Sequence, residues 1–137
     1  MTLRTVVFNA LAGDPALNAL GIDVESLYPN HAPDSPAATQ MRWAVLRWGV
    51  AEPSLGRDTT ARPIAMSLWV YDREKDFGDI DAILKRARAV LLAMPLMATG
   101  DGSIIGVDWA LSSEDLVDET YDAVVRSETY RVVASGI

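Results

Sequence analysis

LWVYDREKDFGDIDAILKRARAVLLAM, residues 68–94, contains the change of periodicity that decides the fold. In the strand that ends here, Ile64, Met66, Leu68 and Val70 lie on one face. Apolar residues then recur every three or four positions, as on one face of a helix. The stretch therefore predicts the end of a strand over 64–71, then a polar turn, and then a helix. Asp76 or Asp79 is expected to cap this helix, which runs to about Met94. Its apolar stripe is predicted to comprise Ile80, Ile83, Leu84, Ala87, Leu91 and Met94.

Five acidic residues lie close together at this junction: Asp72, Glu74, Asp76, Asp79 and Asp81. Carboxylates in such order can bind a hard cation, but acidic residues are also favoured at the start of a helix by its dipole. The spacing does not match an EF-hand loop, and Arg73 and Lys75 lie inside the cluster. We therefore expect capping and solvation. A small metal-binding enzyme that uses Asp72, Asp76 and Asp79 is kept as an alternative.

The rest of the chain predicts one more main helix and four more strands. These elements are a helix over 2–12 and strands over 24–28, 40–48, 103–112 and 122–134. The order is helix, strand, strand, strand, helix, strand, strand, which favours an α+β fold with two main helices packed on a mainly antiparallel sheet. The chain of 137 residues fits a single domain, 1–137.

Three connections or elements carry more specific predictions. The segment 49–63 is polar and rich in turn-forming residues, so it is predicted to be a long hairpin loop. The segment 112–119 is predicted to be an acidic connection in which Ser112 or Ser113 caps a single helical turn. The segment 122–134 is either one long strand or two strands with a bend.

The charge of the chain argues against tight binding to nucleic acid. The net charge is −7, whereas phosphate binding needs a clustered positive surface. The middle of the chain, residues 41–100, has nine basic and seven acidic residues, and the segment 101–137 has eight acidic and two basic residues. A basic and an acidic surface that fit each other are one outcome of this asymmetry, and a mixed surface is the other.

Several classes of site lack the residues they need. The chain has no cysteine, which excludes disulfides and thiolate metal sites, and His31 is its only histidine, in a proline-rich loop. The glycines fit neither a P-loop nor a dinucleotide-binding pattern. No catalytic residue, metal site or cofactor is therefore predicted. The chain reads as a soluble protein without an export signal.

The four tryptophans, Trp43, Trp48, Trp69 and Trp109, all lie in predicted strands. Core packing is the ordinary role for such residues. Trp43 and Trp48 have opposite parity, so they lie on opposite faces of the sheet unless a bulge intervenes. One of them is expected in an interface or under a helix.

Several segments together resemble the tail terminator (tail completion) proteins of long-tailed bacteriophages. After the N-terminal helix, the segments are DPALNALG at 14–21, LYP at 27–29, MRWAVLRWG at 41–49, LWVYDREKDFGDIDAIL at 68–84 and SEDLVDETYDAVVRSETYRVVA at 113–134. The resemblance implies an α+β subunit with this order of elements. It implies no active-site residue and no cofactor.

The resemblance also implies a structural role in the virion. Such subunits form a ring, usually a hexamer, that caps the finished tail tube at the junction of tail and neck. The ring stops tube polymerisation and provides the surface on which the filled head docks, and DNA passes through its lumen without specific binding. The implied partners are other copies of the chain, the tail tube protein and head–tail connector proteins. Assembly is implied in the host cytoplasm, and no membrane is involved.

A ring requires that one patch of a subunit contact a different patch of its neighbour. The mildly basic middle of the chain and its acidic end are candidates for such patches. The residues expected at an oligomer or tail-tube interface are Glu52, Arg57, Arg62, Arg86, Arg88, Glu114, Asp115 and Asp118.

Two alternatives to the terminator role remain at this point. The first is a head-closure or adaptor ring in the same neck, which differs in whether tube or portal-side proteins are bound. The second is the carboxylate-dependent metal-binding enzyme introduced above. A metal that binds only the native state raises the melting temperature, so melting with Mg²⁺, Ca²⁺ or a chelator distinguishes it.

The loop from Glu52 to Arg62 generates a first prediction. Its length, its glycine and proline, and its charges suggest that it changes order when the ring meets the tube, with Arg57 and Arg62 finding acidic partners. Replacing both arginines with alanine is expected to weaken tube capping and to leave the circular dichroism spectrum and the melting temperature unchanged. Normal tail length and full capping with the double variant would contradict the hypothesis.

Overall fold

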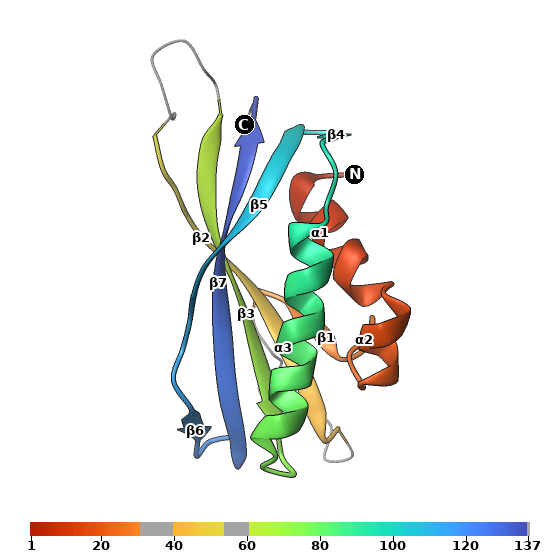
Figure 1. Ribbon diagram of the computed structural model, residues 1–137, viewed down its shortest axis with the longest axis vertical. Coiled ribbons are helices and arrows are strands. Elements are labelled where there is room, and N and C mark those ends of the chain that lie inside the picture. Colours follow the sequence, from red (N-terminus) through yellow and green to blue (C-terminus); the bar gives the residue numbers. More distant parts are fainter. Residues whose placement is uncertain (31–39, 54–60, 137) are drawn as a thin grey trace.

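The computed structural model describes residues 1–30, 40–53 and 61–136 (Figure 1). Three helices and seven strands follow in the order α1 (Leu3–Ala12), α2 (Pro15–Ala19), β1 (Leu27–Pro29), β2 (Arg42–Ala51), β3 (Arg62–Asp72), α3 (Phe77–Leu92), β4 (Met97–Thr99), β5 (Gly102–Ser112), β6 (Leu116–Asp118) and β7 (Ala123–Ser135). The predicted α+β class is confirmed. Within the described ranges, no helix combines the length and the apolar character needed to cross a bilayer.

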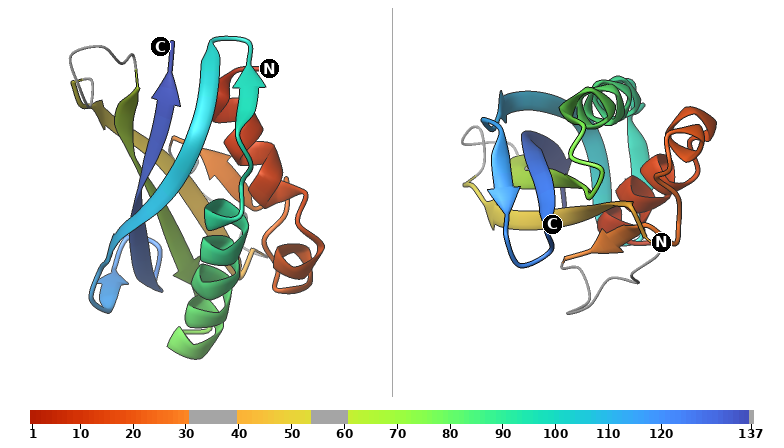
Figure 2. Two further views of the ribbon diagram at one scale, coloured as in Figure 1. Left: turned by 45° about the horizontal axis from the view of Figure 1, so that its top comes forward. Right: turned by 90° about the horizontal axis from the view of Figure 1, so that it is seen from below.

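All seven strands form one twisted sheet. The strand order is β1-β2-β3-β7-β5-β4, and β6 pairs with β7 beyond the end of β5. Every pairing is antiparallel except that of β1 with β2. The long strands β3 and β7 therefore lie at the centre, and β1 and β4 are short strands at opposite margins (Figures 1 and 2).

The helices begin where side chains can accept hydrogen bonds from the first turn. Thr2 Oγ1 accepts from the Thr5 N–H at 3.3 Å, and Asp14 caps α2, with Pro15 at the first helical position. Of the two candidates for the cap of α3, Asp76 fills the role: its carboxylate accepts from the Gly78 N–H at 2.8 Å. Such caps satisfy backbone donors that have no partner within the helix.

The main core lies between one face of the sheet and the three helices, all of which lie on that side (Figure 1). The apolar stripe of α3 is buried as predicted from Ile80 to Leu91, and Met94, beyond the end of the helix, packs against it while partly exposed. On β2 the residues Ala44 and Leu46 face this core, and Trp48 packs against it while partly exposed. As predicted from their opposite parity, Trp43 and Trp48 lie on opposite faces of the sheet, with Trp48 on the helix side.

The other face of the sheet carries a smaller core made of aromatic rings. Trp43 is fully buried and stacks on Tyr71, with ring centroids 5.1 Å apart. Tyr121, from the turn before β7, meets both rings edge-on. The Arg73 guanidinium lies 4.9 Å from the Trp43 ring centroid, a cation–π distance. On the face that has no helix, these aromatic side chains cover one end of the sheet.

The structure corrects the prediction for 112–119. Ser113 caps no helical turn: its N–H donates to the Ser127 carbonyl at 2.8 Å, and its hydroxyl accepts from the Ser127 N–H at 2.9 Å. The chain then forms β6, in which Leu116 is half-buried and Val117 is exposed. Pairing with β7 gives this segment backbone partners that a single isolated turn would lack.

Other strands differ from the predictions in extent. The first strand is confined to 27–29, because the backbone at 23–26 instead forms a turn in which the Asp23 carboxylate accepts from Ser26 N–H. β4 was not predicted; it pairs with the first residues of β5. The segment 122–134 is one strand rather than two. β2 and β3 remain paired as far as Ala51 and Ile64, so they extend into the segment predicted as a loop at 49–63, of which 54–60 lies outside the described residues.

The packing of α3 predicts a large loss of stability for Ile83→Ala. Ile83 is 1% exposed, and removing its buried methyl groups leaves a cavity, so the expected cost is about 2–5 kcal/mol of unfolding free energy. Urea denaturation followed by tryptophan fluorescence measures it. Leu96→Ala is the matched control, since Leu96 is 74% exposed, and should change stability by less than about 0.5 kcal/mol. Equal effects of the two variants would contradict this packing.

Candidate assembly surface

The hairpin end of the molecule carries two of the residues predicted at an interface. Glu52 and Arg62 are both exposed there, and the Glu52 N–H donates to the Pro63 carbonyl at 2.8 Å. Arg57 lies outside the described residues, as does His31. The structure therefore places the ends of the predicted loop at one extremity of the sheet, close to the C-terminal end of β7 (Figure 1).

Arg86 is held within the subunit. Its guanidinium binds both carboxylate oxygens of Asp14, at 2.9 and 2.8 Å, and so connects α3 to the start of α2. The Arg86 guanidinium holds the pKa of the Asp14 carboxyl below its ordinary value of 3.8. Asp14 is thus both a helix cap and one half of an ion pair.

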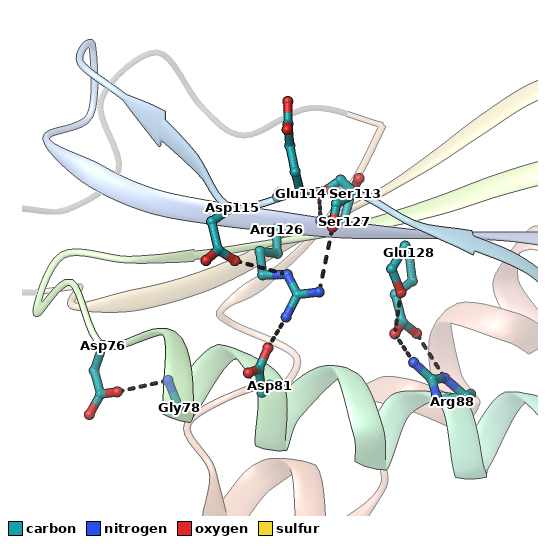
Figure 3. A network of polar contacts seen from close by, with 11 residues as sticks. Asp76, Gly78, Asp81, Arg88, Ser113, Glu114, Asp115, Arg126, Ser127 and Glu128 are labelled. Atoms are coloured by element: carbon teal, nitrogen blue, oxygen red, sulfur yellow. Dashed lines mark hydrogen bonds and ion pairs between the residues drawn. The ribbon is translucent and has the colours of Figure 1, made fainter.

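Arg88 forms a second internal pair, with a buried carboxylate (Figure 3). Its guanidinium donates to both oxygens of Glu128, which is 2% exposed on the helix side of β7. The Tyr130 hydroxyl also donates to this carboxylate, at 2.6 Å, and Ser112 lies 3.2 Å from it. Burial, together with the Glu128 charge, raises the pKa of the Tyr130 hydroxyl, so it stays a neutral donor. On its other side Arg88 lies 4.1 Å from the ring centroid of Trp109.

Two of the acidic residues predicted at an interface, Asp115 and Asp118, also have internal partners. Asp115 lies 3.3 Å from Arg126 Nε, and Arg126 pairs in addition with Asp81 on α3. Asp118 accepts from the Tyr121 N–H at 3.2 Å. Glu114 is exposed, and its side chain points away from the network in Figure 3. The structure therefore does not bring the predicted basic and acidic residues together: Arg86, Arg88 and Asp115 each pair with a residue outside the predicted set.

The junction acids are arranged around Arg42. Asp72, fully buried, lies 3.5 Å from Arg42 Nε and accepts from the Glu74 N–H at 2.8 Å. Arg42 also pairs with Glu74 and Asp79, while Asp76 caps α3. In the part of the chain that the structure describes, no group of three or more acidic or histidine side chains is placed to hold a metal ion. Capping and ion pairing account for these carboxylates.

Sequence reasoning missed Arg42 as the centre of this cluster. It is separated by 37 residues from Asp79, and only the pairing of β2 with β3, which sets Arg42 opposite Asp72, brings them together. The signal that was available is the hairpin itself, because the first residue of one strand must face the last residue of the other.

Apolar side chains are exposed mainly at the margins and ends of the sheet. From β2 onward, the most exposed large ones in the strands and their connections are Val50 (80%), Leu96 (74%), Val117 (70%), Leu111 (56%), Trp109 (45%) and Ile105 (45%). Three of these six belong to β5, at the margin of the sheet. Exposed apolar groups gathered at a margin are typical of surfaces that are covered in an assembly.

An apolar pocket of about 210 Å³ lies at the other margin, between α1 and β2. Its lining residues are Arg4, Thr5, Phe8, Pro29, Asn30, Leu46 and Trp48. The Arg4 guanidinium lies 5.6 Å from the Trp48 ring centroid, so one wall is a cation over an aromatic face. The two margins of the sheet therefore offer different chemistry.

Comparisons with known proteins agree with this architecture. The family model described as tail completion protein gp17 matches residues 5–133. Among solved structures, a chain of the virion of the native gene transfer agent (GTA) particle is similar in fold, with a TM-score of 0.72 and 18% sequence identity. The alignment covers 98% of this chain and 95% of that chain. No curated protein matches the chain.

The two arginines of α3 predict very different effects on stability. Arg88→Ala leaves the buried Glu128 carboxylate without its cation, which is expected to cost about 3 kcal/mol of unfolding free energy. Arg86→Ala, two residues away, removes a pair at the surface and should have a much smaller effect. Chemical denaturation of both variants measures the difference. Adding Glu128→Gln to Arg88→Ala should recover part of the loss, and its failure to do so would argue against an unpaired charge as the cause.

Proposed function

The chain belongs to the tail completion protein gp17 family, and on that premise we propose that it forms the ring that caps a phage tail tube. In this proposal the ring ends tube polymerisation and provides the surface on which the head docks. As a member of this family, the protein is a structural component of a phage tail.

The observation that carries the proposal is the extent of the family match. Residues 5–133 begin within α1, end within β7 and include all the elements between them, so the match concerns the whole fold rather than a single motif. The similarity to a virion chain supports the same architecture but, at 18% identity, speaks only for the fold.

The distribution of surface chemistry is compatible with a ring. A ring is built from heterologous contacts, in which two different patches of the subunit meet. Here one margin of the sheet carries exposed apolar residues of β5, and the opposite margin carries an apolar pocket beside β2. A net charge of −7 suits a conduit through which DNA passes without being held.

The proposal includes specific partners and a location. The subunit would contact other copies of itself, most simply in a hexamer, and the ring would contact the tail tube protein on one side and head–tail connector proteins on the other. It would act at the tail–neck junction of the virion after assembly in the host cytoplasm. The proposal assigns it no catalytic role and no cofactor.

Mixing the purified protein with tail tube protein tests the proposal. We expect light scattering to give the mass of about six subunits, either for the free protein or for the complex released from tube tips. Negative-stain images should show a ring on one end of each tube, and tubes should stop growing once it is added. The tube protein alone, which continues to polymerise, is the control.

Two outcomes would change the conclusion. A ring that ignores tube tips but binds the portal-side connector proteins would replace the terminator role by that of a head-closure or adaptor ring. A protein that stays monomeric with both kinds of partner, and leaves tube growth unchanged, would overturn the proposal.

A further inference from the structure

Two strands have outer edges that are only partly occupied within the subunit. β1 pairs with β2 at residues 44–46, which leaves 47–51 without a neighbouring strand on that side in the described part of the chain. β4 pairs with β5 at residues 102–104, which leaves the rest of β5, including 107–111, similarly open in the described residues. Such edges present unpaired backbone N–H and C=O groups and are ready to pair with another chain.

The two open segments lie at the same level of the sheet. Across the strands, Arg47 aligns with Ser67, then Thr129, then Leu111. At the other end of each segment, Ala51 aligns with Ile64, then Val132, then Val107. Residues 47–51 of β2 are therefore aligned across the sheet with residues 107–111 of β5, so the two margins offer open strand edges at the same height.

The direction of the strands is also suitable. Three successive antiparallel pairings separate β2 from β5, so these strands run in opposite directions within one subunit. A rotation about a ring axis that runs along the strands preserves strand direction. The β5 segment of one subunit therefore meets the β2 segment of the next in antiparallel orientation, which allows hydrogen-bonded pairing. Each segment contains one register shift, at 48–51 in β2 and at 109–111 in β5.

The side chains on the two margins complement each other on both faces. On the helix side, Trp109 of β5 is 45% exposed, and the pocket at the β2 margin is lined by Phe8 and Trp48. On the helix-free side, Asp108 of β5 and Arg47 of β2 are both exposed and of opposite charge. The two margins differ from each other and have complementary side chains. A second copy of the chain is therefore the partner that suits each margin best.

We propose that neighbouring subunits join by pairing residues 107–111 of one β5 with residues 47–51 of the next β2, so that one sheet continues around the ring. This inference rests on the proposed function, because it specifies the contact by which the ring closes. Pairing along strands supplies the affinity, and the flanking side chains supply the specificity, as in other cases of strand addition.

Disulfide trapping tests the pairing directly, because the chain has no cysteine of its own. In the double variant Arg47→Cys/Leu111→Cys, the two positions in one subunit are three strand spacings apart, about 14 Å. A disulfide needs Cα atoms within about 7 Å, so any bond must join two subunits. Oxidation of the assembled ring is expected to give a ladder of covalent oligomers on a denaturing gel.

Three controls define the result. Either single variant should give dimers at most, and a mixture of the two single variants should give dimers of mixed composition. The pair Lys85→Cys/Leu111→Cys moves one cysteine to the exposed face of α3 and should give no ladder. Because a variant can fail for other reasons, hydrogen exchange on the unsubstituted protein is the second measurement. Amides in 47–51 and 107–111 should exchange about tenfold or more slowly in the ring than in the monomer.

The outcomes separate this inference from the function on which it rests. A ring that caps tubes, yields no ladder and leaves exchange in both segments unchanged would overturn the strand pairing and leave the terminator role intact. A chain that forms no ring, alone or on tube tips, would overturn both. A ladder with slowed exchange in both segments supports the contact.

Discussion

The pairing of β3 with β7 is the interaction on which the rest of the structure depends. The two strands are paired from Arg62 with Ala134 to Asp72 with Val124, the full length of β3. This register fixes which residues face the helices and which face the aromatic cluster, because a slip of one residue would exchange the two faces. It also sets β2 and β5 at defined heights on either side.

Arginine side chains then fasten the helices and turns to that frame. Arg88 and Arg126 connect α3 to β7 and to the β5–β6 connection, and Arg42 gathers the acids at the junction of β3 and α3. A planar guanidinium can bind two carboxylates at once, which a lysine ammonium does less well. Ten of the twelve basic residues are arginines, and several of them are used inside the subunit rather than presented to a neighbour.

Local patterns could be predicted from the sequence, and long-range pairings could not. The cap and the apolar stripe of α3 depend on residues within one helix, so their periodicity was sufficient. The opposite parity of Trp43 and Trp48 likewise follows from a single strand. By contrast, β4 and β6 are three residues long and exist only because β5 and β7 lie beside them. The pairing of Arg88 with Glu128 required knowledge of which strand lies under α3, which charge counts along the chain do not contain.

The short strands β1 and β4 have a consequence for the geometry of assembly. β1 occupies residues 44–46 of β2 and β4 occupies residues 102–104 of β5, so each covers one part of its margin and leaves the rest open. In a contact of that kind, a displacement along the strand would add a small rise at every subunit and convert a closed circle into an open filament with a pitch. The two short strands would therefore oppose a pitch of one hand, because both meet the neighbouring strand when the subunit that contributes β2 moves toward the β4 end of the sheet.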